Sequence, residues 1–206
     1  MRALIVDDDA AIVELLEGYL TGRGVTVSSV ADAASAREAL RTTMFDVLVC
    51  DLGLPDGEGR DIIVAAQRAA TPTPVVVTTG RATVDQAVAA LESGASALLF
   101  KPFKLKALYD AVSRAVTERR AALLSERGHA LLTAAAMADA GSPAIGDALV
   151  AGLHRYAELA GCRVEFDPSG RPLGPVVRVA IEGDAALLEP YVRAVHQALT
   201  RVSRGA

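Results

Sequence analysis

The chain has 206 residues, of which 51% are apolar and only 4% aromatic, a composition typical of a globular protein with an Ala/Val/Leu core. Its formal charge of -4 provides no overall excess of Lys and Arg for contact with nucleic acid or anionic lipid. The two cysteines, Cys50 and Cys162, lack CxxC spacing, and no basic and apolar signal segment opens the chain, so we expect a reduced, cytoplasmic protein. No run of about 18 apolar residues is present, and we expect no membrane partner.

Five short runs rich in aliphatic or β-branched residues recur along the first half of the chain, separated by stretches that resemble helices. The runs are residues 3–6, 25–30, 47–50, 74–78 and 97–100. The intervening stretches 10–20 and 84–91 carry apolar residues at helical spacing. This alternation predicts an α/β fold with a doubly wound, five-stranded parallel sheet covered by helices on both faces. Continuous apolar sequences such as "VLVC" are typical of central strands buried on both sides.

The pattern changes after about residue 105. From there to about residue 138 the sequence contains no proline and a single glycine, and apolar residues recur close to helical spacing. We therefore predict one long helix that leaves the first domain. Ser142 and Pro143 are typical of the first positions of a second helix, which we expect to end near residue 160.

Two strand-like runs follow in the tail, "CRVEFD" and "PVVRVAIEG", joined by the turn-rich sequence "PSGRPLG". A last amphipathic helix is predicted from 184 to about 202. Because a single hairpin is marginally stable alone, we expect this one to pack on the tail helices or to complete a sheet in a partner chain. The sequence therefore predicts two domains, 1–120 and 121–206, of which the second is a small α+β domain with the order α-α-β-β-α.

Polar side chains follow the buried strands at the points where those strands end. Asp7 and Asp8 follow the first strand, Asp51 the third, Thr79 the fourth and Lys101 the fifth. The ends of parallel strands lie along one edge of the sheet, where open α/β sheets bind ligands. Clustered aspartates repel one another unless a hard cation lies between them, which favours Mg²⁺ or Mn²⁺. We expect Asp51 to be a nucleophile toward a phosphoryl group, while Lys101 and the metal neutralise its oxygens and Thr79 donates a hydrogen bond.

The acidic run "DDD" also fits a simpler role, because carboxylates at a helix N-terminus act as caps. Since the other strand ends carry matching polar residues, we assign Asp7 and Asp8 to a metal site and Asp9 to the cap. Thr78 offers an alternative hydroxyl one position earlier in the chain, but the interval to the lysine favours Thr79.

At this point the sequence resembles the receiver domain of bacterial two-component response regulators. The resemblance covers about residues 1–120 and rests on "LIVDDD" (4–9), "VLVCDLGLPDGEG" (47–59), "VVVTTG" (75–80) and "LFKPF" (99–103). These elements stand in order, with 28 residues from Asp51 to Thr79 and 22 from Thr79 to Lys101. The C-terminal part of the chain resembles no family that we recognise.

The resemblance implies a flavodoxin-like fold and a phosphoacceptor role. Asp51 would accept a phosphoryl group from the His of a sensor histidine kinase or His phosphotransfer protein, or slowly from small phosphodonors. Asp8, Asp51 and the backbone carbonyl of Gly53, with waters, would hold Mg²⁺ (Mn²⁺ being the alternative), and Asp7 would assist through water. Such a chain is not an enzyme beyond its own slow phosphorylation and dephosphorylation.

The resemblance also assigns Thr79 as the switch hydroxyl and Lys101 as the phosphate partner, and it implies a cis peptide bond between Lys101 and Pro102. Leu98 stands where many family members carry an aromatic residue that moves inward on phosphorylation, so the sequence departs from the family at this position.

Gly53 and Arg81 occupy positions that tune dephosphorylation in the family. Gly53 has no side chain to orient an attacking water. We therefore expect a moderately long-lived phosphoryl group.

The output of the tail has three interpretations. Residues 122–206 contain 8 Arg and no Lys against 9 Asp plus Glu, without a basic recognition helix, so we expect no nucleic acid and favour a non-DNA output to an unknown downstream protein. The apolar stripe of the long helix predicts a homodimer. The alternatives are a DNA-binding transcriptional regulator with an unrecognised output fold, and a phosphorelay intermediate in which His129 accepts the phosphoryl group.

Overall fold

The chain forms two compact units, Met1–Arg119 and Arg120–Ala206. The computed structural model describes residues 1–56, 59–69, 72–80, 83–137, 143–165, 180–182 and 185–203. Within these ranges no helix is both long enough and apolar enough to cross a membrane.

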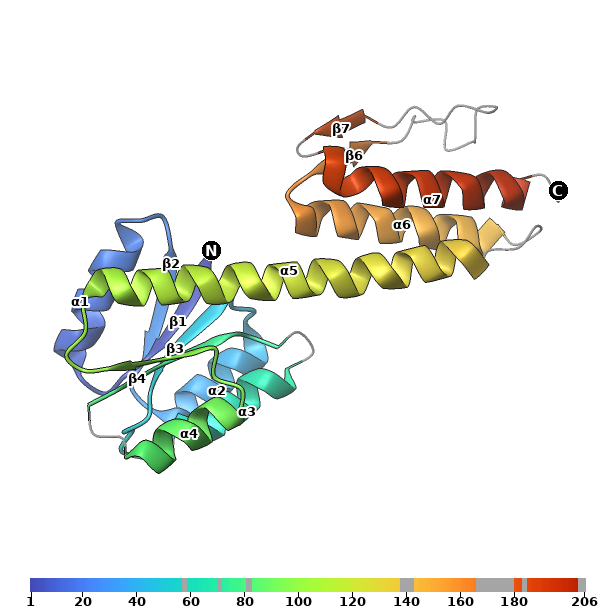
Figure 1. Ribbon diagram of the computed structural model, residues 1–206. Helices are drawn as coiled ribbons and strands as arrows, with labels where there is room; N and C mark the ends of the chain where they lie inside the picture. The colour runs from blue at the N-terminus through green and yellow to red at the C-terminus, as the bar shows by residue number, and fades with distance from the viewer. Residues whose placement is uncertain are drawn as a thin grey trace. The chain divides into compact units, whose positions relative to one another are not determined.

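The first unit contains a five-stranded parallel sheet with the strand order β2-β1-β3-β4-β5 (Figure 1). Its strands are β1 (Arg2–Val6), β2 (Thr26–Val30), β3 (Val47–Asp51), β4 (Val75–Thr79) and β5 (Ala97–Phe100). The chain proceeds from β1 outward to β2 and then returns across β1 to β3, so the direction of winding reverses between β1 and β3. The predicted doubly wound, flavodoxin-like sheet is confirmed.

Helices cover both faces of this sheet (Figure 1). One face carries α1 (Ala10–Thr21) and α5 (Leu105–Met137), and the other carries α2 (Ala33–Thr42), α3 (Gly59–Arg68) and α4 (Val84–Glu92). The side chains of β1 serve both layers, since successive residues of a strand point to opposite faces. Leu4 and Val6 are buried beneath α2–α4, whereas Ala3 and Ile5 are buried beneath α1 and α5.

Helix α1 begins with the cap that the sequence predicts. The Asp9 side chain accepts hydrogen bonds from the backbone N–H groups of Ala11, at 2.9 Å, and Ile12, at 3.3 Å. These groups have no partner within the helix, so the carboxylate satisfies both. The capping role of Asp9 is confirmed.

Helix α4 does not bury the apolar stripe that its sequence shows. Val84, Val88 and Leu91 are 79%, 47% and 50% exposed, whereas Ala90 is buried. A small residue permits the helix to lie close to the sheet, and the larger residues are left on the solvent side. The apolar pattern located the helix without marking its buried face.

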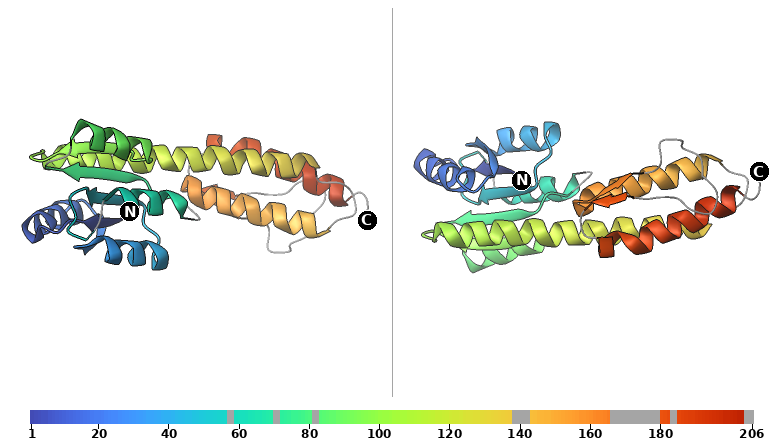
Figure 2. Two further views of the ribbon diagram at one scale, coloured as in Figure 1. Left: turned by 90° about the horizontal axis from the view of Figure 1, so that it is seen from below. Right: turned by 90° about the horizontal axis from the view of Figure 1, so that it is seen from above.

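The second unit has the predicted order α-α-β-β-α. After the C-terminal part of α5 come α6 (Pro143–Ala160), β6 (Arg163–Glu165), β7 (Ala180–Glu182) and α7 (Ala185–Ser203). Strands β6 and β7 pair antiparallel, β6 packs against α6, and α6 and α7 lie side by side (Figure 2). The hairpin therefore packs within its own unit. The predicted cap Ser142 and the turn "PSGRPLG" lie outside the described residues.

Helix α5 is a single helix that contributes to the cores of both units. Leu108, Val112 and Ala115 are buried in the first unit, and Leu131 and Ala135 are buried in the second. Much of the apolar stripe is therefore covered by its own chain, although Leu123 is half-buried and Ala134 is exposed. The homodimer stays a prediction.

Candidate functional site

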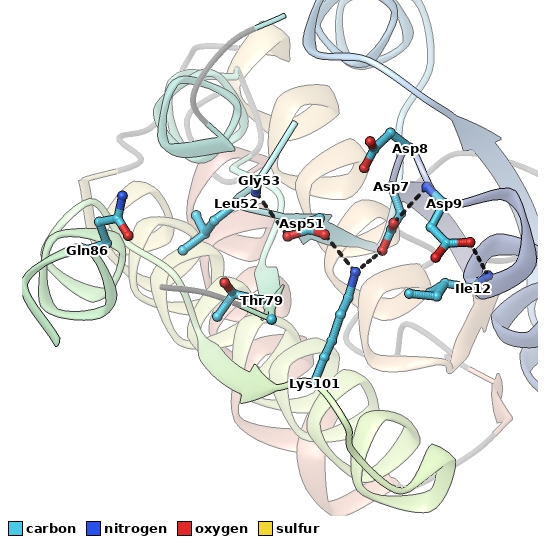
Figure 3. A pocket seen from close by; sticks show the side chains of 11 residues that line it. Asp7, Asp8, Asp9, Ile12, Asp51, Leu52, Gly53, Thr79, Gln86 and Lys101 are labelled. Atoms are coloured by element: carbon cyan, nitrogen blue, oxygen red, sulfur yellow. Dashed lines mark hydrogen bonds and ion pairs between the residues drawn. The ribbon is translucent and has the colours of Figure 1, made fainter. Parts of the chain in front are cut away.

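The predicted polar residues meet at the carboxyl edge of the sheet. Asp51 and Thr79 are the last residues of β3 and β4, Asp7 directly follows β1, and Lys101 directly follows β5. One pocket brings them together (Figure 3); its lining comprises Asp7, Asp8, Asp9, Ile12, Asp51, Leu52, Gly53, Thr79, Gly80, Gln86 and Lys101. All residues predicted for the site line this pocket.

Lys101 links two of the carboxylates (Figure 3). Its Nζ lies 2.6 Å from Asp7 Oδ2 and 2.6 Å from Asp51 Oδ2. The lysine side chain is 17% exposed, and those of Asp7 and Asp51 are 2% and 12% exposed. Water therefore screens these ion pairs less than it would at the surface. The contact between Lys101 and Asp7 was not foreseen from the sequence.

The second oxygen of each paired carboxylate is held by the backbone. Asp7 Oδ1 accepts a hydrogen bond of 3.1 Å from the Asp9 N–H, and Asp51 Oδ1 accepts one of 3.0 Å from the Gly53 N–H. In both cases the donor lies two residues further along the chain, the geometry by which Asp side chains stabilise turns. The two acids are therefore fixed in orientation.

The pKa values of Asp7 and Lys101 are shifted because these charged groups are close together and largely buried. Burial raises the pKa of Asp7, and the neighbouring Asp51 carboxylate adds to the rise, against the lowering effect of Lys101 and the Asp9 N–H. For Lys101, burial opposes the charged form, but hydrogen bonds to Asp51 and Asp7 leave its pKa raised. The lysine is therefore charged at neutral pH, and ionised Asp7 carries a cost.

The acidic cluster fits a hard divalent cation. Asp7, Asp8 and Asp51 each offer a carboxylate oxygen, and these oxygens lie within 4.8 Å of one another. Three carboxylates against the single ammonium of Lys101 leave an excess of negative charge when all are ionised. Oxygen ligands at this spacing suit Mg²⁺ or Mn²⁺. The donor set therefore agrees with the metal expected from the sequence.

The structure distinguishes the two candidate hydroxyls. Thr79 lines the pocket, whereas Thr78 is completely buried and its Oγ1 has no hydrogen-bond partner among the described residues. Successive strand residues point to opposite faces, so these two side chains do not share surroundings. The geometry favours Thr79, as the spacing predicted. The Lys101–Pro102 peptide bond is cis, as expected.

None of the described cysteine or histidine side chains lines this pocket. Burial, together with Asp51 and Asp7, raises the pKa of the Cys50 thiol, which is consistent with its place in the buried strand sequence "VLVC". His129 is exposed on α5, in the second unit, while His154 and His196 are partly buried there. Their positions neither add to the acidic pocket nor test the alternative relay role of His129.

Two residues near the pocket were missed by the sequence reasoning. Gln86 lines it from the first turn of α4, where its side chain accepts a hydrogen bond of 3.0 Å from the Thr83 N–H. The pattern Thr-x-x-Gln is the sequence signal of this capping box. The second residue is Asp56, whose carboxylate accepts two backbone hydrogen bonds from α2.

The match to known proteins covers the first unit. A family model for the response regulator receiver domain matches residues 3–113, more than half of the chain. The chain is 41% identical over 119 residues to the response regulator protein PmrA of Pseudomonas aeruginosa, covering 58% of this chain and 53% of that protein. It is 37% identical over 107 residues to the DNA-binding response regulator MtrA of Mycobacterium tuberculosis, covering 52% of this chain and 46% of MtrA.

The fold of the first unit is also similar to that of solved receiver domains. The crystal structure of a CheY-like response regulator receiver domain protein from Methanospirillum hungatei superposes with a TM-score of 0.55 at 29% identity, covering 57% of this chain and 94% of that one. The chain spans about half the length of the two curated relatives, and the family model does not extend beyond residue 113. By its first unit, the chain belongs to the response regulator receiver domain family.

Proposed function

We propose that Asp51 accepts a phosphoryl group from the His of a sensor histidine kinase or a His phosphotransfer protein, and that this switches the second unit. The observation that carries the proposal is the position of Asp51, whose carboxylate is held by Lys101 and the Gly53 N–H in an acidic pocket. Its role is that of a phosphoacceptor in signalling rather than of an enzyme acting on a separate substrate.

The chemistry is a displacement at phosphorus. An oxygen of Asp51 forms the new P–O bond while the P–N bond to the donor imidazole breaks, and the electron pair leaves with the imidazole, which takes up a proton. Lys101 is charged and already touches Asp51, so it is placed to neutralise the phosphoryl oxygens. Thr79 supplies a hydroxyl donor from the end of β4.

Four groups would hold the metal. They are the Asp8 and Asp51 carboxylates and the Gly53 carbonyl as ligands, with Asp7 acting through water. When bound, Mg²⁺ neutralises negative charge on the phosphoryl oxygens. The crowding of the acids supports this proposal, because it makes the pocket costly without a cation.

A direct test is to incubate the full chain with phosphoramidate and Mg²⁺ and to measure its intact mass. We expect the mass of one added phosphoryl group in the wild type, and none in Asp51→Asn or with excess chelator. Asp32→Asn is the matched control, since it removes a half-buried carboxylate from the cap of α2, does not touch the acidic pocket and should leave labelling intact. Labelling of Asp51→Asn at the wild-type rate would contradict the proposal.

The lifetime of the phosphoryl group is a second measurable property. Gly53 lines the pocket without a side chain that orients water, so we expect a moderately long-lived aspartyl phosphate. Arg81, the other residue assigned to this property, lies outside the described residues. Decay of the isolated phosphoprotein after removal of the donor measures the lifetime, and a half-life of seconds would refute the prediction.

The names of the relatives favour transcriptional regulation as the output of this chain, whereas the composition of the tail favours an output through protein interaction. MtrA is named a DNA-binding response regulator, and this supports DNA as a partner, contrary to the expectation from tail composition. A balanced net charge does not exclude a local basic surface. We propose phosphorylation-controlled DNA binding as the output to test first.

Selection from random duplex DNA tests this output. The full chain activated with beryllofluoride and Mg²⁺ is compared with Asp51→Asn under the same conditions. Enrichment of one sequence by the activated chain alone supports regulation of transcription. If no sequence is enriched, the DNA-binding output is wrong and the protein-interaction output is restored.

A further inference from the structure

The loop after β3 carries the Gly53 carbonyl, and it is held near its start by two contacts. The Gly53 N–H donates a hydrogen bond of 3.0 Å to Asp51 Oδ1, and this bond holds the start of the loop against the Asp51 side chain. The Leu54 side chain is 8% exposed and packs into the core beneath α2, α3 and α4. Polar and apolar contacts together therefore determine the path of residues 52–54.

Asp56 provides a third contact, and it reaches a different segment of the chain. One carboxylate oxygen, Oδ1, accepts a hydrogen bond of 2.8 Å from the Ala33 N–H, and the other, Oδ2, accepts one of 3.2 Å from the Ala34 N–H. Both donors belong to the first turn of α2. These N–H groups have no partner within a helix, and the positive end of the helix dipole favours a carboxylate there.

Helix α2 already has a cap of its own. The Asp32 side chain accepts from the Ser35 N–H at 2.7 Å and from the Ser35 hydroxyl at 2.8 Å. Two carboxylates therefore serve one helix end, but only Asp56 comes from outside the helix. Its contacts join the loop after β3 to α2, whereas those of Asp32 are local.

We propose that Asp56 is a positioning residue for the metal site, a role that rests on the proposed function of the pocket. Only two residues separate Asp56 from Gly53, so a displacement of one is transmitted to the other through a short length of backbone. By fixing the loop to α2, Asp56 holds the segment that offers the Gly53 carbonyl to Mg²⁺. Residues that orient metal ligands without touching the metal commonly control affinity in this way.

Asp32 makes it possible to separate this role from ordinary capping. Asp56→Ala and Asp32→Ala each remove one carboxylate from the same end of α2, and each lowers helix stability. Asp56→Ala alone releases the loop that carries Gly53. Asp56→Asn retains a carbonyl oxygen that can accept one of the two backbone hydrogen bonds.

The experiment is calorimetric titration of the full chain and these variants with Mg²⁺ alone, alongside urea unfolding in its absence. We expect Asp56→Ala to weaken Mg²⁺ binding by about 10-fold. Asp56→Asn should recover most of the affinity, and Asp32→Ala should bind like the wild type although it unfolds at lower urea. Because neither carboxylate is buried in the core and each variant leaves the other cap of α2 in place, we expect all three variants to fold.

The inference is overturned if Asp56→Ala binds Mg²⁺ as tightly as the wild type, or if Asp32→Ala weakens binding to the same extent. The proposed function has its own control in the same series. If the wild type binds no Mg²⁺, or Asp51→Asn binds it with unchanged affinity, the metal site itself is wrong, whatever the behaviour of Asp56.

Discussion

Gly59, in the first turn of α3, lies so close to Asp51 that a β-carbon at residue 59 would clash with the Asp51 carbonyl oxygen. The same β-carbon would be 2.8 Å from Cα of Leu52. Both neighbours are backbone atoms, which cannot rotate away as the end of a side chain can. The close approach of α3 to the end of β3 therefore requires glycine.

Replacement of Gly59 should directly disturb Asp51, the proposed phosphoacceptor. In Gly59→Ala the backbone of α3 or of β3 must shift, and we expect a loss of about 1 to 3 kcal/mol in the free energy of unfolding. The shift also displaces Asp51 from Lys101, so phosphorylation by phosphoramidate should slow. Urea unfolding and intact mass measure the two effects.

Gly53→Ala is the matched control for this prediction. Among the described residues, a β-carbon there would meet only Asp51 Oδ1, at the ordinary contact distance of 3.7 Å. We expect its free energy of unfolding to stay close to that of the wild type. If the two alanine variants were equally stable, close approach would not be the reason for glycine at residue 59.

Lys101 supplies the positive charge of the pocket in the absence of a metal. Lys101→Ala leaves Asp7 and Asp51 facing each other without their shared partner, and removal of one member of a buried ion pair is strongly destabilising. We expect the melting temperature to fall without Mg²⁺ and to rise more on its addition than in the wild type. Thermal unfolding with and without Mg²⁺ measures both changes.

Lys106→Ala provides the comparison. Its ammonium also pairs with a carboxylate, that of Asp110 at 2.7 Å, but this pair is exposed on α5. Exposed pairs contribute less than about 1 kcal/mol, so neither the melting temperature nor its response to Mg²⁺ should change much. An equal Mg²⁺ response in the two variants would mean that Lys101 does not compensate the acidic cluster.

Asp7 should show a conflict between stability and metal binding. Because its pKa is raised, chiefly by burial, the folded state favours the protonated form, and stability is lost as the pH rises through this pKa. Asp7→Asn cannot ionise and avoids that loss. At neutral pH, with a chelator present to remove Mg²⁺, we expect Asp7→Asn to unfold at a higher urea concentration than the wild type.

The pH dependence of unfolding shows whether ionisation of Asp7 causes the greater stability expected of Asp7→Asn. The advantage of Asp7→Asn should shrink as the pH falls and Asp7 of the wild type becomes protonated, while its Mg²⁺ affinity at neutral pH should be lower than that of the wild type. Urea midpoints across the acid range and a Mg²⁺ titration test these expectations. An advantage that is independent of pH would exclude ionisation as its origin.

The sites of chemistry were predictable because they follow from local patterns and one rule of topology. Apolar runs locate the strands, and the residues that end them, Asp51 and Thr79, must share an edge once the sheet is parallel. Periodicity also located the long helix α5 to within one residue of its observed end. These features need no knowledge of which helix packs where.

Features that depend on tertiary contacts were not predictable in this way. Lys101 pairs with Asp7 across 94 residues of sequence, and Asp56 reaches Ala33 across 23. On α5, apolar residues are buried in two different cores, which a single stripe drawn along the sequence does not reveal. The exposed Val84 shows that an apolar pattern alone does not determine which face of a helix is buried.

The second unit contains a close contact that tests its packing. Gly128 of α5 is buried, and a β-carbon there would lie 2.5 Å from the Tyr191 hydroxyl oxygen and 2.7 Å from two ring carbons. The Tyr191 ring also packs on Tyr156, with centroids 4.2 Å apart, so it has little freedom to retreat. Gly128→Ala should therefore lose about 1 to 3 kcal/mol, despite the better helix propensity of alanine.

Gly152→Ala, on α6, is the appropriate control. Its β-carbon would be 3.1 Å from Leu131 Cδ1, the end of a side chain that needs to shift by only a few tenths of an ångström, so this variant should be tolerated better than Gly128→Ala. Hydrogen exchange of the α6 amides reports the second unit separately from the first. Protection should fall in Gly128→Ala, and adding Tyr191→Ala should remove most of the penalty caused by the alanine at residue 128, because the two residues are in contact. If the penalty is the same with and without Tyr191, the contact between α5 and α7 does not limit residue 128.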